Sequence, residues 1–240
     1  MFSFISETWN PVAGACSHGC VGCWARALAD RHSWSKYQGV PRVDETQIGR
    51  RFKEGQFVFV QDMTDLFAED VPREVIACVL GAIYRSPDAK FLLLTKNPKR
   101  YFEFVLDVPD NCVLGVTIES DRIDPRISGA PNRQDRMLWM LRVKLLFAVR
   151  KRPNDSSLPL FVSIEPILDF NLEEFTNVLG RWVVPWAVAV GYDNYGCGFP
   201  EPPLAKTLAL IDELRGFSLG GLCLNIFRKT LREPLIQKSI

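Results

Sequence analysis

The stretch QFVFVQDMTDLFAEDVPREVIACVLGAIYRSPDAKFLLLT (residues 56–95) holds two short apolar runs with a helical pattern between them. Residues 56–61 and 90–95 are rich in Val, Phe and Leu and have the length of buried strands. Residues 71–86 have helical apolar spacing, and Pro72 suits the first turn of a helix. A strand, a crossover helix and a second strand form the unit from which parallel sheets are built. This stretch therefore predicts two parallel strands covered by a helix.

The same alternation continues on both sides of this unit. We expect further strands at residues 2–5, 112–118, 158–164, 184–191 and 222–227. Further helices are expected at residues 23–34, 97–106, 132–151, 172–182 and 202–216. Near-continuous apolar strands between helices indicate a parallel sheet that helices cover. The predicted fold class is α/β, a single partial (β/α)6-type TIM barrel with a mostly parallel sheet, and a doubly wound open sheet is the alternative.

Length and composition are those of an ordinary globular protein. The 240 residues are 47 % apolar and 24 % charged, with a net charge of +1, which implies no global attraction to nucleic acid or anionic membrane. No repeat or linker divides the chain, since residues 152–159 connect a helix to a strand, so we expect one domain over residues 1–240. No apolar run is long enough to span a bilayer. Seven cysteines, an odd number, argue against a disulfide framework, so we predict a cytoplasmic protein without membrane association.

Three cysteines follow the first expected strand in the run GACSHGCVGCWA, with the spacing C-x3-C-x2-C. Thiolates of Cys16, Cys20 and Cys23 on one tight loop can ligate three irons of a [4Fe–4S] cluster and leave the fourth iron open to a small molecule. A zinc site completed by His18 or His32 is an alternative. A redox pair of Cys20 and Cys23 is another, although it leaves Cys16 without a role. The remaining cysteines stand singly, at positions 78, 112, 197 and 223.

Polar residues follow the expected strands at their carboxyl ends. In (β/α) barrels, reactive groups gather on the loops at this edge. Glu119 and Glu165 are the strongest acidic candidates because each directly follows an apolar run without turn residues. Acidic residues elsewhere are also typical of helix caps and solvated loops. The candidate residues at these strand ends are Met63, Thr64, Asp65, Lys96, Glu119, Ser120, Glu165, Tyr192 and Asp193.

These features resemble the radical S-adenosylmethionine (radical SAM) superfamily, whose partial (β/α)6 barrels carry a cluster loop after the first strand. The closer likeness is to a subgroup of short phage and prokaryotic radical-SAM-like proteins. It spans roughly residues 8–195. Five segments carry it: Thr8-Trp9-Asn10-Pro11, Cys23-Trp24-Ala25, Asp65-Leu66-Phe67, Leu93-Leu94-Thr95-Lys96-Asn97-Pro98 and Ser163-Ile164-Glu165-Pro166.

The resemblance implies a cluster on the three cysteines and S-adenosylmethionine on the open iron. A donor such as ferredoxin or flavodoxin would reduce the cluster, and cleavage of the cofactor would give a 5′-deoxyadenosyl radical that abstracts hydrogen from a substrate. The superfamily often has Gly-Gly-Glu after strand two, a polar residue after strand four and an aromatic residue before the third cysteine, where this chain has Gly22. The residues expected to contact the cofactor are Trp24, Met63, Thr64, Asp65, Glu119 and Ser120.

The substrate is expected at the strand ends farther from the cysteine loop, at Lys96, Glu165, Tyr192 and Asp193. Lys96 would contact an anionic group of the substrate, or else pair with a carboxylate such as Glu119 or Glu165.

Residues 121–153 contain nine Arg or Lys against three Asp, which indicates a phosphate-contacting patch, with Arg133 and Arg136 in it, or a solvated helix face. The predicted substrate is a nucleic acid or nucleotide. The alternative function is a non-catalytic, zinc-stabilised barrel that binds nucleic acid.

Overall fold

Seven parallel strands form the main sheet of the computed structural model, which describes residues 2–124, 127–149, 159–219, 222–229 and 231–234. Every hydrogen-bonded pair in this sheet is parallel. In spatial order the strands are β1 (Glu7–Trp9), β4 (Phe57–Val60), β5 (Lys90–Thr95), β6 (Cys112–Thr117), β7 (Leu160–Ile164), β8 (Ala187–Val190) and β11 (Asn225–Arg228).

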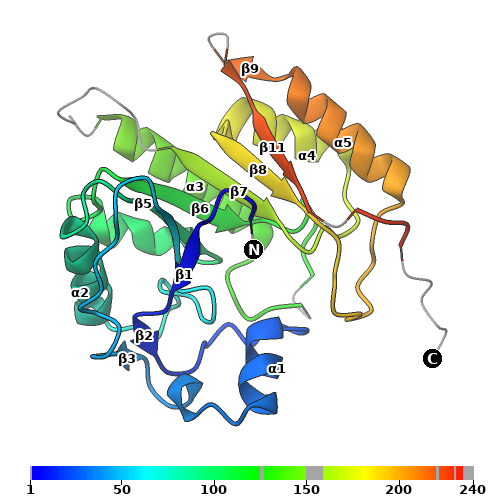
Figure 1. Cartoon of the computed structure of the whole chain (residues 1–240). Helices are drawn as coiled ribbons and strands as arrows, with labels where there is room; N and C mark the ends of the chain where they lie inside the picture. The colour runs from blue at the N-terminus through cyan, green and yellow to red at the C-terminus, as the bar shows by residue number, and fades with distance from the viewer. Residues whose placement is uncertain (1, 125–126, 150–158, 220–221, 230, 235–240) are drawn as a thin grey trace.

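The spatial order of these strands follows their order along the chain. A doubly wound sheet contains a point at which the strand order reverses. The seven strands described show no such reversal, and the sheet curls into a half-barrel (Figure 1). The predicted partial TIM barrel is therefore confirmed, and the doubly wound alternative is wrong.

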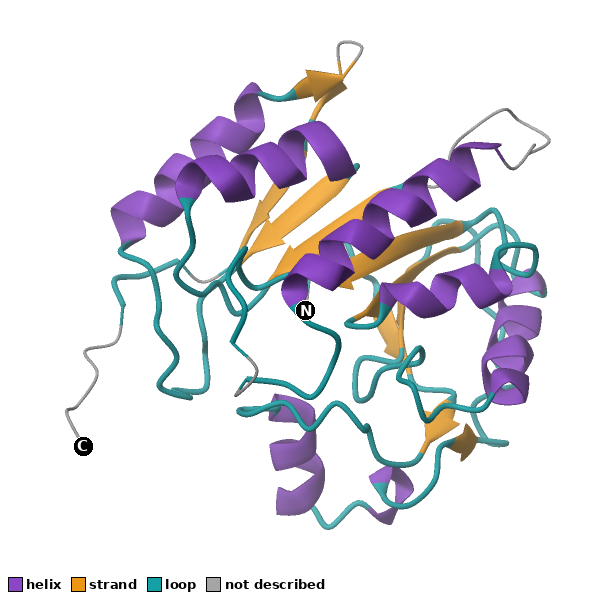
Figure 2. Cartoon of the chain, turned by 180° about the vertical axis from the view of Figure 1, so that it is seen from behind, coloured by secondary structure: helices purple, strands orange, loops and turns teal. Residues whose placement is uncertain are grey.

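Helices cover one face of the curled sheet (Figure 2). They are α2 (Arg73–Tyr84), the 3-10 helix η2 (Pro98–Phe104), α3 (Arg133–Val149), α4 (Leu172–Asn177) with a π-helical turn η3 (Val178–Val183), and α5 (Leu204–Gly216). Apolar residues of α2 recur at the spacing of one helix face, and Ile76, Val79, Leu80 and Ile83 are all buried. The main core lies between these helices and the sheet.

Smaller elements surround this framework. The cysteine loop leads into α1 (Trp24–Arg31) and the 3-10 helix η1 (Ser35–Tyr37), which lie below the sheet in Figure 1. Two antiparallel ladders are formed by β2 (Val12–Ala13) with β3 (Arg42–Val43) and by β9 (Ser218–Leu219) with β10 (Leu222–Cys223). Within the ranges described, no helix has the length and apolar character needed to cross a membrane.

The expected first strand at residues 2–5 is wrong, because this segment packs against the inner face of the sheet. The rings of Phe2 and Phe161 pack edge-on with their centroids 4.9 Å apart, and the ring centroids of Phe4 and Phe227 are 4.5 Å apart. These rings join Leu92 and other residues on the sheet face opposite the helices. The free energy gained by burying the two aromatic side chains here exceeds what pairing this segment as a strand would give. The first strand of the sheet is β1 instead.

Several helix boundaries also differ from those expected. Residues 97–106 form η2 rather than an α-helix, and the pattern at 172–182 is divided between α4 and η3. The helix expected at 132–151 is present as α3, while residues 150–151 and nearly all of the expected loop at 152–159 lie outside the described residues.

Candidate active site at the carboxyl ends of the strands

A cavity of about 520 Å³ opens at the carboxyl ends of the strands of the main sheet. Its walls come from the cysteine loop, from the ends of β4 to β8 and from the residue that follows β11. It is large enough for a drug-sized ligand. Twelve of the thirteen residues predicted for the site line it, namely Cys16, Cys20, Cys23, Trp24, Met63, Thr64, Asp65, Lys96, Glu119, Glu165, Tyr192 and Asp193.

The three cysteines of the loop are free thiols and partly exposed. Cys23 is the N-cap residue of α1, and its Sγ accepts a hydrogen bond from the backbone N–H of Arg26. Cys20 Sγ lies 3.1 Å from Ser128 Oγ on the loop after β6. Burial, reinforced by the negative charge of Asp65, raises the pKa of Cys16 to about 12. Cys16 is therefore a protonated thiol that must release its proton when it binds a metal.

Neither histidine completes a zinc site with these cysteines. His18 Nε2 lies 2.7 Å from Asp65 Oδ2, and the ring of His32 stacks on that of Trp34 with centroids 5.1 Å apart. Across the described residues, no group of three or more His, Cys, Asp or Glu side chains is placed around a position for one metal ion. The cysteine loop itself offers three thiols as metal ligands, and cysteine thiolates ligate both zinc and iron–sulfur clusters.

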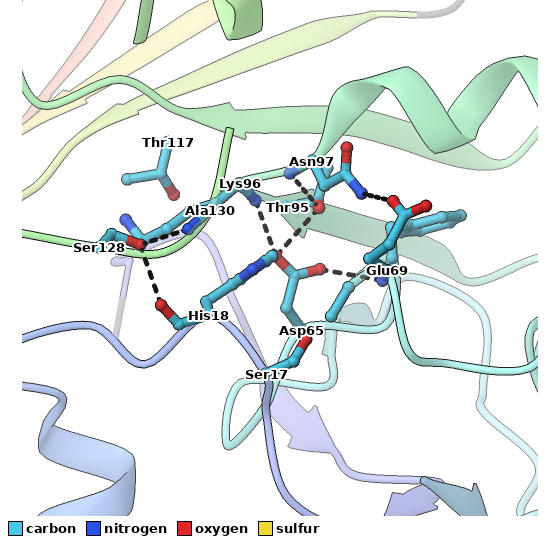
Figure 3. A network of polar contacts seen from close by, with 12 residues as sticks. Ser17, His18, Asp65, Glu69, Thr95, Lys96, Asn97, Thr117, Ser128 and Ala130 are labelled. Atoms are coloured by element: carbon cyan, nitrogen blue, oxygen red, sulfur yellow. Dashed lines mark hydrogen bonds and ion pairs between the residues drawn. The ribbon is translucent and has the colours of Figure 1, made fainter. Parts of the chain in front are cut away.

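Asp65 is the centre of a buried polar network (Figure 3). Its Oδ2 accepts hydrogen bonds from Thr95 Oγ1 at 3.0 Å and from the backbone N–H of Lys96 at 2.8 Å, in addition to the contact with His18. Its Oδ1 accepts from the backbone N–H of Phe67 at 2.9 Å. Burial acts to raise the pKa of Asp65, but the hydrogen bonds and the charge of His18 outweigh it and lower that pKa. The carboxylate is therefore fully engaged within the protein.

The neighbours of Asp65 on the β4 loop are also held in place. Met63 donates its backbone N–H to Asn10 Oδ1 at 3.1 Å, and Thr64 Oγ1 accepts from Gln61 Nε2 at 2.6 Å. One of the sequence segments singled out above, at residues 8–11, thus contacts the β4 loop at Met63, two residues before the segment at 65–67.

Glu119 is a buried carboxylate shared by three cations. Lys96 Nζ lies 2.5 Å from its Oε1, while Arg133 Nε and Arg136 Nη1 lie 3.0 and 2.9 Å from its Oε2. Burial acts to raise the pKa of Glu119, but the charges of Lys96, Arg136 and Arg133 hold it well below its usual range. The alternative in which Lys96 pairs with a neighbouring carboxylate is the arrangement observed.

The expected phosphate contacts at Arg133 and Arg136 are wrong, since these residues are only 4 % and 2 % exposed. A solvated helix face does not describe them either, because both point into the protein toward Glu119. Elsewhere in the basic stretch, Arg122 pairs with Asp169 and Arg142 lies over the ring of Trp139. Of the remaining basic positions, Lys144 is half-buried on α3, and positions 126, 150, 151 and 152 lie outside the described residues.

Ser120 is the predicted site residue that does not line the cavity. Its hydroxyl donates to the backbone carbonyl of Asp169 at 2.6 Å and accepts from the backbone N–H of Arg122 at 3.0 Å. These bonds hold the loop after β6, so the hydroxyl is turned to the backbone rather than to the pocket.

A second ion pair lines the cavity at the ends of β7 and β11. Lys229 Nζ lies 2.9 Å from Glu165 Oε1, and Ser163 donates to Glu165 Oε2 at 3.3 Å. The hydroxyl of Tyr192 is buried between the carbonyl of Pro202 and Thr207 Oγ1. The Tyr192 hydroxyl is therefore used within the protein, whereas the Glu165–Lys229 pair faces the cavity.

Several pocket residues were missed in the sequence. Lys229 directly follows the last strand, so its position at a strand end was a signal that could have identified it. Phe2 lines the cavity because the N-terminal segment crosses the inner face of the sheet. The sequence suggests His18 only as a zinc ligand, and no local pattern predicts its contact with Asp65.

Comparisons with known proteins agree with this architecture. The profile of the family described as "Protein of unknown function (DUF5131)" matches residues 1–140. No curated protein sequence matches the chain.

Two solved structures of spore photoproduct lyase variants are similar to it. One, with bound AdoMet and dinucleoside spore photoproduct, has a TM-score of 0.55 at 11 % identity, covering 88 % of this chain and 62 % of that one. The other, with dinucleoside spore photoproduct, has a TM-score of 0.53 at 12 % identity, covering 87 % of this chain and 61 % of that one.

The chain thus spans about six tenths of the length of these structures, and at such identities the likeness shows the fold alone. That fold is the partial barrel expected from the radical SAM resemblance. The family profile covers more than half of the 240 residues. The chain therefore belongs to the DUF5131 family.

Proposed function

We propose that this protein is a radical SAM enzyme in which Cys16, Cys20 and Cys23 hold a [4Fe–4S] cluster. The observation that carries the proposal is their common cavity: the three thiols line the same space of about 520 Å³ as the polar ends of five parallel strands. In (β/α) barrels this edge is where active sites are built. One of the structural neighbours, on the same fold, holds AdoMet.

The donor set fits such a cluster. Three cysteines from one loop supply three ligands, and both nearby histidines are engaged elsewhere. When bound, the cluster and S-adenosylmethionine would supply the one-electron chemistry that yields a 5′-deoxyadenosyl radical. The aromatic walls of the cavity, which include Phe2, Phe59 and Phe199, would exclude water from reactive species.

Residues near the cysteine loop would bind the cofactor. Trp24, Met63 and Thr64 line the cavity beside the cysteines, and Glu119 presents a carboxylate whose position is fixed by three cations. In this proposal Asp65 holds the surrounding backbone in place, and Ser120 has no contact with the cofactor.

The ends of β5, β7, β8 and β11 would receive the substrate. The residues that line the cavity there are Lys96, Glu165, Tyr192, Asp193 and Lys229, and we propose a nucleotide or a single nucleic-acid base as the substrate class. A structural neighbour that holds a dinucleoside supports this class. A base within a nucleic acid would have to leave its stack to enter this cavity.

The setting of the reaction completes the proposal. Residues 1–240 would act as one barrel domain in a reducing cytoplasm, which keeps the thiols free for the cluster. A small electron carrier such as ferredoxin or flavodoxin would deliver the electron.

Anaerobic reconstitution with iron and sulfide tests the proposal. The protein should take up about four irons and four sulfides per chain, and replacement of all three loop cysteines by Ala should abolish this uptake. Single replacements of Cys78 or Cys112 are the matched controls and should not change it. With S-adenosylmethionine and a reductant, the loaded protein should release 5′-deoxyadenosine. Stoichiometric zinc without iron after anaerobic purification would contradict the proposal.

A further inference from the structure

His18 is the one buried residue of the cysteine loop between Ala15 and Trp24. Glycines with positive φ flank the second cysteine, Gly19 at +54° and Gly22 at +71°, so the loop turns tightly with few side chains that could anchor it. The position of the thiols therefore depends on a small number of contacts.

The side chain of His18 joins the loop to the ends of two strands. Its Nε2 lies 2.7 Å from Asp65 Oδ2, and Asp65 is itself fixed by the backbone N–H of Phe67 after β4 and by Thr95 and Lys96 at the end of β5. Figure 3 shows His18, Thr95 and Lys96 converging on the carboxylate of Asp65. A carboxylate held by four donors is a rigid support, because none of the bonds can be lost without leaving a buried charge less satisfied.

The backbone of His18 joins the loop to the opposite side of the site. Its carbonyl accepts the backbone N–H of Gly129 at 2.7 Å, and Val21 donates its N–H to the carbonyl of Ile127 at 2.8 Å. Thus the side chain of His18 contacts the loop after β4 at Asp65, which in turn is bonded to the end of β5, and the carbonyl of His18 contacts the loop after β6. It lies midway between Cys16 and Cys20, so its displacement would move both thiols.

We propose that His18 and Asp65 form a positioning pair that holds the cysteine loop in its metal-binding conformation. This inference rests on the proposed function, because it assigns the pair a role toward the cluster. It also makes a claim about the metal-free protein, in which the same contacts fix the loop.

The first experiment therefore uses metal-free protein. In His18→Leu, hydrogen–deuterium exchange of residues 14–23 should rise at least several-fold and the loop thiols should react faster with a maleimide, while exchange in α5 stays unchanged. His18→Gln retains an amide N–H that can donate to Asp65 and should restore most of the protection. His32→Leu, which removes the other histidine, is the matched control and should leave exchange of residues 14–23 unchanged. Equal exchange in His18→Leu and wild type would overturn the inference.

The second experiment uses reconstituted protein. His18→Leu should lose iron several-fold faster than wild type, and His18→Gln should retain it. Asp65→Asn keeps the shape of the acceptor side chain but removes a negative charge near Cys16. The cluster bound by this variant should therefore have a higher reduction potential than the wild-type cluster. A loss of fold stability alone would not change the reduction potential. Wild-type iron retention in His18→Leu would overturn the inference. If wild-type protein binds no iron at all, the proposed function fails, and the exchange experiment still decides the role of the pair.

Discussion

Cys197 Sγ occupies the space that a side chain at Gly22 would need: a Cβ built on Gly22 would lie 2.0 Å from this sulfur. Gly22 directly precedes Cys23, and Cys197 comes from the loop after β8. The absence of a side chain at position 22 therefore allows the β8 loop to pack against the cysteine loop, where the superfamily often has an aromatic residue.

Gly22→Ala should disrupt the cysteine loop through both overlap and backbone strain. The positive φ of +71° costs an L-residue about 1–2 kcal/mol, and the overlap with Cys197 adds to that cost. Gly39→Ala is the matched control, since Gly39 has φ +74° but no atom within 4 Å of its added Cβ. The midpoint temperature of thermal unfolding and the amount of iron taken up should both fall more in Gly22→Ala than in Gly39→Ala. The double variant Gly22→Ala/Cys197→Gly should recover part of the loss, and no recovery would show that overlap is not the cause.

Glu119→Gln should strongly destabilise the fold. The substitution leaves Lys96, Arg133 and Arg136 around a neutral group, and breaking a buried ion pair in this way costs about 3–5 kcal/mol. Asp169→Asn is the control, because Asp169 also pairs with two cations, Arg122 and Lys206, but is partly exposed and should cost less than about 1 kcal/mol. Urea unfolding of the metal-free wild type and variants measures the loss of unfolding free energy caused by each substitution. Similar losses in the two variants would mean that burial does not set the strength of the Glu119 cluster.

The stability conferred by Glu119 should depend on pH in the acid range. Its pKa in the folded protein lies below the value of about 4.3 that is usual for glutamate, so the contribution is complete above that pH and is lost as the pH falls toward the folded pKa. The difference in unfolding free energy between wild type and Glu119→Gln should therefore be constant near neutrality and shrink from about pH 5 to pH 3. Denaturant titrations at several pH values measure it. A difference that stays constant to pH 3 would contradict the lowered pKa.

Sequence patterns predicted the parts of this site that depend on strand ends. The apolar runs before Lys96, Glu119 and Glu165 fix where each strand stops, and parallel strands bring their ends to one edge. The contact between His18 and Asp65 joins residues 47 positions apart, and no periodicity encodes that pairing.

The errors have a physical cause as well. The sequence predicts surface cations at Arg133 and Arg136 because charged residues are rarely buried without partners, and their partner Glu119 belongs to a different element. Phe2 and Phe4 suit a strand by composition, yet they fill the inner face of a sheet whose curvature the local sequence does not specify.

Lys229→Met should leave the fold intact and weaken ligand binding. The Lys229 and Glu165 side chains are 27 % and 16 % exposed, whereas the Glu119 side chain is 2 % exposed, so the Lys229–Glu165 pair is more accessible to water and should contribute less to stability than the Glu119 cluster. Such a pair on the cavity wall can exchange its partner for the polar groups of a substrate at little cost. Equilibrium dialysis with a mononucleotide should show weaker binding to reconstituted Lys229→Met than to wild type. Lys90→Met, at the exposed start of β5 and away from the cavity, should bind as wild type does. If Lys229→Met instead lowers stability as much as Glu119→Gln, the pair is part of the framework that holds β11 to the sheet, and the substrate contact must be sought elsewhere on this wall.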